Sequence, residues 1–83
     1  MIEVEGKIDN HPISILINYT SSHNYINSNI VERFYLQRIK HKKSWLVQLA
    51  TWAKRKINEL VKDCLIDMNG LSTKVDVNII PLG

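Results

Sequence analysis

Apolar and polar residues alternate near the start of the chain, which is the pattern of a β-strand with one buried face. Residues 2–5 read Ile-Glu-Val-Glu, and residues 13–17 read Ile-Ser-Ile-Leu-Ile. Between them, residues 9–12 read Asp-Asn-His-Pro, a composition typical of turns. We therefore predict a β-hairpin over residues 2–17.

The next segment changes from polar residues to a helical spacing. Residues 18–29 are polar and rich in turn formers, after which apolar residues recur at the spacing of one helix face at Ile30, Val31, Phe34 and Tyr35. Asn29 and Glu32 have the spacing of an N-terminal capping box. The pattern predicts a short amphipathic helix from residue 28 to about residue 38, followed by a basic loop over residues 40–44.

The second half of the chain predicts two more hairpins. One strand face is expected to hold Trp45, Val47, Leu49 and Thr51. Residues 52–55 would form a hairpin tip, and residues 57–68 would return as a long strand. One side of that strand is expected to hold Leu60, Lys62, Cys64, Ile66 and Met68. Asn69-Gly70 favours a type I′ turn, and the alternation over residues 75–79 predicts a last strand. The expected fold is mostly β, a small closed barrel or sandwich of hairpins with one short helix, in a single domain over residues 1–83.

Composition supports a β fold. The chain has 83 residues and a mass of 9.6 kDa, with 12 Ile, 6 Val and 3 Thr against 2 Ala. Side chains branched at Cβ fit a pleated surface better than a helix, which argues against a helical bundle. A domain of this size has a thin core, so a partner subunit is expected.

Several classes of protein are excluded by what the sequence lacks. Cys64 is the single cysteine, so no internal disulfide can form, and His11, His23 and His41 show no metal-ligand spacing. We expect no metal and no cofactor. No apolar run approaches the length of a membrane span, and the first residues do not have the pattern of a signal peptide. These features predict an intracellular, cytoplasmic protein without a membrane partner.

Positive charge is concentrated in two clusters. The net charge is +3, and residues 40–43 and 54–56 hold six of the 11 cations. A nucleic-acid surface is one interpretation. No interleaved aromatic residues or binding motif accompany the clusters, so we favour a solvated loop and a solvated hairpin end over a nucleic-acid partner. Among single residues, Cys64 and Trp45 are interpreted as core residues, and His23 as a loop histidine bonded to backbone.

Five segments of the chain resemble a retropepsin-like aspartic protease domain, of the kind found in plant Ty3/Gypsy-type retrotransposon polyproteins. The segments cover nearly the whole chain and read VEGKIDNHPISILI, SSHNYINSNIVERF, WLVQLAT, KRKINELVKDCLIDMNG and VDVNIIPLG. In the family, the strand matching residues 13–17 leads into Asp-Ser/Thr-Gly-Ala-Ser/Thr and then His-x-Tyr/Phe-Ile. The second part is present here as Ser22-His23-Asn24-Tyr25-Ile26, whereas Asn18-Tyr19-Thr20 stands at the position of Asp-Ser-Gly.

The resemblance implies an aspartic peptidase family whose active relatives process polyproteins, and it predicts that this chain is an inactive pseudoenzyme. The family's hydrolase chemistry needs two carboxylates, one from each subunit of a homodimer, that share one proton. Asn18 has nearly the shape of Asp but cannot accept a proton from water. Thr20 lacks the backbone freedom of glycine, and Tyr19 is too large to replace a serine or threonine simply.

The match also assigns the remaining site residues. Asn18, Tyr19 and Thr20 would occupy the catalytic loop, and an extended peptide would be contacted by Ser21, Ser22, Thr51, Trp52 and Ala53. Trp52 would stand at the tip of the flap, the hairpin that closes over substrate, where glycine is usual. The family's pattern continues past Gly83 with a strand and a helix, so we expect this chain to lack them.

Two alternatives to the peptidase assignment remain open. The same fold without chemistry would serve as a dimerising or peptide-binding module. A small basic nucleic-acid-binding domain is the third hypothesis.

Overall fold

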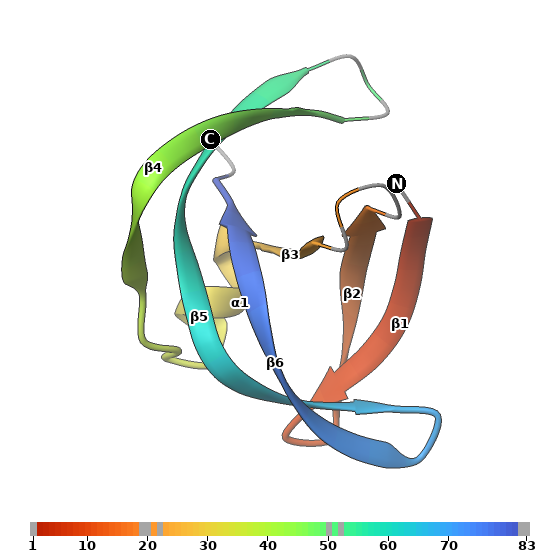
Figure 1. Cartoon of the computed structure of the whole chain (residues 1–83). Helices are drawn as coiled ribbons and strands as arrows, with labels where there is room; N and C mark the ends of the chain where they lie inside the picture. The colour runs from red at the N-terminus through yellow and green to blue at the C-terminus, as the bar shows by residue number, and fades with distance from the viewer. Residues whose placement is uncertain (1, 19–20, 22, 50, 52, 82–83) are drawn as a thin grey trace.

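The computed structural model describes residues 2–18, 21, 23–49, 51 and 53–81, and these residues form six strands and one short helix (Figure 1). The elements are β1 (Ile2–Ile8), β2 (His11–Asn18), β3 (His23–Asn27), α1 (Ser28–Arg33), β4 (Ile39–Gln48), β5 (Lys54–Met68) and β6 (Leu71–Ile80). The expectation of a mostly β chain with one helix is confirmed. In the described part of the chain, no helix has the length and apolar character needed to cross a membrane.

The strands form a single sheet in the order β1-β2-β3-β6-β5-β4. A further pairing between β1 and β5 closes five of these strands into a ring, and β4 lies outside the ring. All pairings are antiparallel except that of β3 with β6, which is parallel. The closed ring agrees with the predicted small barrel or sandwich of hairpins.

The first hairpin forms as predicted, with a tighter turn. β1 pairs with β2 from Ile2 opposite Ile17 to Ile8 opposite His11. Asp9 and Asn10 alone make the turn, with φ values of 49° and 65°, the left-handed conformation that a type I′ turn requires at both central positions. Asn69 and Gly70 form the second such turn, with φ values of 52° and 81°.

Gly6 allows β1 to approach β5 closely where the ring closes. Lys7 pairs with Asp67 at this point. A Cβ atom on Gly6 would lie 2.8 Å from Ile15 Cδ1, 3.0 Å from Ile66 Cγ2 and 3.3 Å from the Asp67 carbonyl oxygen. A side chain at this position would therefore force its neighbours to shift.

A bulge in β5 reverses which residues face the core. The pairing register with β6 shifts between Val61 and Cys64, and Asp63 has a φ of 53°. The Asp63 backbone N–H donates to Asp76 Oδ1 over 2.9 Å. Val61, Cys64 and Ile66 are buried, whereas Lys62 is exposed. The predicted strand face containing Lys62 is therefore wrong, because a bulge changes the alternation.

Two separate apolar clusters stabilise the fold. The larger, which we call the ring core, is formed by Ile8, Ile13, Ile15, Ile26, Ile30, Val31, Val61, Cys64, Ile66, Val77 and Ile79. The smaller, which we call the hairpin core, is formed by Tyr25, Val47, Ile57 and Ile80, with Leu16, Trp45 and Leu49 packed against it. Consecutive residues, such as Ile79 and Ile80, enter different cores because neighbouring side chains of a strand point to opposite faces. The hairpin core holds the β4–β5 hairpin, which arches across the top of Figure 1.

The helix is shorter than predicted and begins at a different cap. Asn27 is the N-cap, and its Oδ1 accepts a hydrogen bond from the Ile30 backbone N–H over 3.0 Å. Asn29 lies inside the helix, so the predicted capping box is wrong. Soon after the helix ends at Arg33, Tyr35 adopts a φ of 53°, which no α-helix contains.

Two predicted loops are strands. Residues 23–27, predicted as part of a polar turn region, form β3, because they pair with β2 on one side and β6 on the other. The predicted basic loop over residues 40–44 lies within β4. It is irregular, because Lys40 pairs with Glu59 and Trp45 pairs with Ile57, so residues 41–44 stand opposite Asn58 alone.

Candidate functional site

A groove of about 400 Å³ lies between the β2–β3 connection and β4. Its described lining is Asn18, Ser21, His23, Tyr25, Trp45, Leu46, Val47 and Gln48. Asn18 pairs with His23 where β2 passes its chain to β3, and the hairpin core brings residues 45–48 over this end of the sheet. We call this site the β2–β4 groove.

A buried tyrosine joins the two walls of the groove. Tyr25 is only 1% exposed, and its hydroxyl accepts a hydrogen bond from Trp45 Nε1 over 3.3 Å. The same hydroxyl lies 3.5 Å from His23 Nδ1. Because an indole N–H can only donate, the Tyr25 oxygen is the acceptor in its bond with Trp45. The hydroxyl therefore links the groove residues His23 and Trp45.

Two imidazole rings contact the Trp45 ring. Its centroid lies 5.2 Å from that of His23 and 4.8 Å from that of His41. His41 Nε2 lies 2.7 Å from Oδ1 of the buried Asn78, whose Nδ2 donates to the Asn24 carbonyl over 3.4 Å. Since the Asn78 amide nitrogen is directed at that carbonyl, its oxygen accepts a proton carried on His41 Nε2. The network ties β4 to β3 and β6 beneath the groove.

The groove contains two of the predicted site residues. Asn18 is half-buried at the end of β2, and the exposed Ser21 lies beside it in the lining. Tyr19, Thr20, Ser22 and Trp52 fall outside the residues that the structure describes.

Two further predicted site residues lie in the connection between β4 and β5. Thr51 is exposed and Ala53 is half-buried. The Leu49 backbone N–H donates to the Ala53 carbonyl over 2.9 Å, which narrows this connection. Neither residue belongs to the described lining of the groove.

Sequence reasoning missed the contribution of His23, Tyr25 and His41. His23 was interpreted as a loop histidine, but it lies in β3 and contacts the Trp45 ring. Residues 23–26, His-Asn-Tyr-Ile, contained the signal: Tyr25 follows His23 by two residues, so in a strand the two side chains lie on the same face. The core interpretation of Trp45 holds in part, since this half-buried residue packs on the hairpin core and also lines the groove.

The described lining is polar and aromatic but carries no carboxylate and no thiol. Cys64 lies in the ring core as predicted, and burial raises the pKa of its thiol above the ordinary value of 9.0. Within the described residues, no three or more His, Cys, Asp or Glu side chains are grouped so that they could hold a metal ion. The groove is therefore suited to hydrogen bonding and apolar contact.

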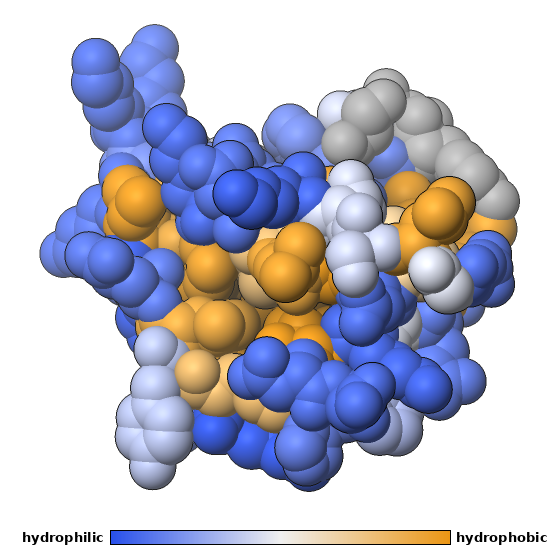
Figure 2. All heavy atoms as spheres, turned by 90° about the horizontal axis from the view of Figure 1, so that it is seen from below, coloured by the Kyte–Doolittle hydropathy of each residue, from blue (hydrophilic) through white to orange (hydrophobic). Residues whose placement is uncertain are grey.

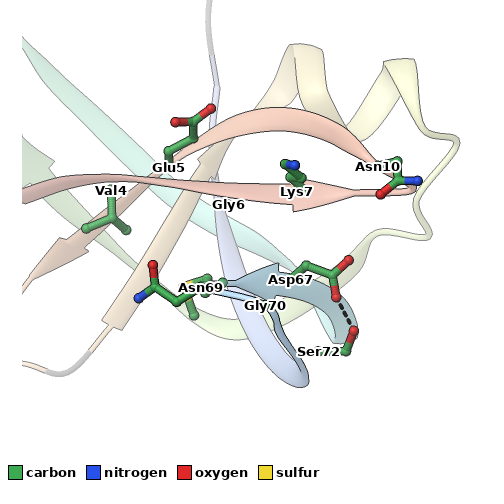
Figure 3. Close-up of a pocket in the computed structure, with 10 residues that line it drawn as sticks. Val4, Glu5, Gly6, Lys7, Asn10, Asp67, Asn69, Gly70 and Ser72 are labelled. Atoms are coloured by element: carbon green, nitrogen blue, oxygen red, sulfur yellow. Dashed lines mark hydrogen bonds between the residues drawn. The ribbon is translucent and has the colours of Figure 1, made fainter.

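A larger groove of about 900 Å³ runs between β1 and the β5–β6 turn (Figure 3). It includes Glu5, Lys7 and Asp67, but the Glu5 and Asp67 carboxylates do not point toward one another in Figure 3. Asp67 already accepts a hydrogen bond from Ser72 Oγ. Because its charged groups do not converge, we do not treat this groove as the functional site.

No protein-family model, curated protein or solved structure matches this chain. The functional assignment therefore depends on the geometry of the β2–β4 groove and on the sequence resemblance.

Proposed function

We propose that this chain is a retropepsin-like domain that holds an extended peptide in the β2–β4 groove without cleaving it. The observation that carries the proposal is that Asn18 and Ser21 line the same groove as residues 45–48. The resemblance implies that Asn18 and Ser21 belong to the active-site loop, and that residues 45–48 form the strand leading into the flap, which it places over residues 49–56. Their meeting in one groove supports this assignment.

The position of β4 favours a peptide as the occupant. In the described part of the chain, β4 pairs with β5 alone, so its other edge presents backbone donors and acceptors beside the groove. An extended peptide can add to such an edge by main-chain hydrogen bonds. Leu46 is 66% exposed and offers an apolar contact to the bound chain.

The groove chemistry argues against catalysis. An aspartic peptidase needs a pair of carboxylates that share one proton, so that one acts as acid and the other as base. The Asn18 amide cannot take either role, and the described lining contains no Asp or Glu. General acid–base assistance contributes about 10²–10⁴-fold, so its loss leaves binding without turnover.

A peptidase assay of Asn18→Asp tests the loss of catalysis. We expect no cleavage by the unmodified chain from acidic to neutral pH, and at most slight cleavage by the variant, because Tyr19 and Thr20 remain in the loop. Asn18→Ala serves as the matched control. Full turnover by the single Asp variant would show that the loop itself is competent.

A peptide-binding measurement tests the groove. Leu46→Ser should weaken the binding of an extended peptide about fivefold, because apolar contact area is lost. Leu71→Ser is the matched control, since Leu71 is 73% exposed at the β5–β6 turn, away from the groove lining. Equal losses in the two variants would contradict binding at this site.

Association of two copies is the second candidate function. Hydrophobic residues are exposed across the lower face of the molecule (Figure 2). Ile39 and Leu65 are 41% and 56% exposed, and both line a shallow pocket with Leu36 and Val61. Sedimentation at high micromolar concentration tests this candidate: a dimer that Leu65→Glu dissociates supports it, and a monomer rejects it.

A further inference from the structure

The part of the β4–β5 hairpin nearest its tip carries concentrated positive charge. Residues 39–58 contain six cations and no Asp or Glu. Both ion pairs found among the described residues involve Arg38, which contacts Glu32 and Glu59. None of the six hairpin cations takes part in either pair, so their charge is available to a ligand.

Four of these cations lie close along the strands to residues that line the β2–β4 groove. Lys42 and Lys43 are exposed in the irregular part of β4, three and two residues before the groove-lining Trp45. On β5, Lys54 and Lys56 are exposed and pair with Gln48 and Leu46, which line the groove. Paired strands lie about 4.8 Å apart, so a chain bound at the outer edge of β4 would lie about 9.6 Å from β5. The flexible side chains of Lys54 and Lys56 and a facing Glu side chain can bridge this span together.

We infer that the peptide held in the β2–β4 groove is acidic, with Asp or Glu side chains beside Lys42, Lys43, Lys54 and Lys56. This inference rests on the proposed function and names the class of partner. An extended peptide paired with β4 directs every second side chain to one face, where carboxylates would meet the exposed lysines. The absence of any carboxylate from the described groove lining removes local repulsion.

The same features favour a peptide over a nucleic acid. Single-stranded nucleic acids are held by cations together with aromatic rings on which bases stack. Tyr25 is buried, and two tilted imidazole rings already lie against the half-buried Trp45, so the groove has no row of exposed aromatic rings for successive bases. The open edge of β4 instead presents a row of backbone donors and acceptors. The backbone of an extended peptide can form hydrogen bonds along this row, whereas nucleic-acid bases lack the matching repeat.

The test compares extended Val/Thr-rich peptides that differ only at alternate positions, which are Glu, Gln or Lys. We expect the Glu peptide to bind the full chain about tenfold more tightly than the Gln peptide at about 0.05 M salt, because several weak ion pairs act together. The Lys peptide should bind most weakly. The difference between Glu and Gln peptides should nearly vanish at about 0.5 M salt, where charges are screened.

Charge-neutralising variants locate the effect. Lys42→Gln with Lys43→Gln, and separately Lys54→Gln with Lys56→Gln, should each weaken the Glu peptide about threefold or more while leaving the Gln peptide nearly unchanged. The matched control is Lys7→Gln with Lys74→Gln, which removes the same charge from exposed residues on β1 and β6. It should change binding by less than about twofold, because these lysines neither line the groove nor lie on the two strands of the β4–β5 hairpin.

The outcomes separate the two proposals. Equal binding of Glu and Gln peptides overturns the acidic partner but retains peptide binding. If no peptide binds, the proposed function fails as well. A single-stranded oligonucleotide that binds more tightly than the Glu peptide, and loses affinity in the same lysine variants, overturns the inference in favour of a nucleic acid.

Discussion

At the scale of single residues, the fold depends on a few positions with special backbone requirements. The two glycines of the described chain serve different purposes. Gly70 provides a positive φ in a turn that has open space around it, whereas Gly6 lies where three neighbouring atoms leave no room for a Cβ atom. The first requirement is conformational and the second is steric, so the two positions should respond differently to substitution.

Gly6→Ala is expected to lower the free energy of unfolding by about 1–3 kcal/mol, because an added Cβ overpacks the contact between β1 and β5. Gly6→Asn should be worse, since its side chain is larger. At Gly70 the order should reverse, with Asn tolerated better than Ala because asparagine accepts a left-handed backbone. Urea unfolding of the four variants measures this, and the same order at both sites would contradict the steric account of Gly6.

At the scale of elements, short segments are positioned by their neighbours as much as by their own pattern. β3 has only five residues, and it persists because it is paired on both sides. α1 has only six residues and follows β3 directly. A helix this short has little stability of its own, so its N-cap and the burial of Ile30 and Val31 are expected to stabilise it.

Asn27→Ala should lower the free energy of unfolding by about 0.5–2 kcal/mol, because it removes the side chain that accepts from the Ile30 N–H. Asn29→Ala is the matched control and should change stability by less than about 0.5 kcal/mol, since Asn29 is exposed within the helix. Chemical denaturation of both variants distinguishes the two caps. A larger loss of unfolding free energy in Asn29→Ala than in Asn27→Ala would instead support the capping box predicted from the sequence.

At the scale of the whole molecule, the two cores support different parts of the fold. The ring core closes the five-stranded ring, whereas the hairpin core holds β4 against the sheet and forms the groove. The groove could therefore loosen while the ring stays intact. Regions that bind ligands are commonly less stable than the scaffold that carries them.

Val47→Ala, in the hairpin core, should raise hydrogen exchange mainly in β4 and in the part of β5 paired with it. Ile66→Ala, in the ring core and fully buried, should lower the global free energy of unfolding by about 2–5 kcal/mol, because it leaves a cavity. Amide exchange in β1 and β2 separates the two effects, because it should rise in the Ile66→Ala variant and change little in the Val47→Ala variant. If Val47→Ala raises exchange equally throughout the chain, the cores act as one unit.

The sequence correctly predicted the turns and strands that depend on neighbouring residues. It did not predict the features that depend on pairing between strands far apart in the chain. Asp9-Asn10 and Asn69-Gly70 favour turns wherever they occur, and the alternation in β1, β2 and β6 follows from burial of one strand face. The alternation of β5 could not be followed through its bulge, because the partner residue Asp76 lies on another strand. The polar β3 has no strong pattern of its own and is defined by β2 and β6.

The candidate site was predicted in part. Asn18 and Ser21 were chosen from the resemblance, and both line the β2–β4 groove. The opposite wall is formed by residues that were predicted only as one face of a strand. The hydrogen bonds between Tyr25 and Trp45 and between His41 and Asn78 join residues that are 20 and 37 positions apart in the sequence. Such contacts depend on how the hairpin folds over the sheet, which residue spacing does not specify.

The sequence by itself determined that this chain is a β protein of hairpins with one short helix, because turn formers and the period of two act over a few residues. It also determined that residues 39–58 are basic without acidic compensation. Only the tertiary structure decided that five strands close into a ring, that β4 lies at an edge of the described sheet, and that the basic hairpin forms one wall of a groove lined by Asn18. Those features arise from pairings and packing between distant segments, whose free energy no local pattern contains.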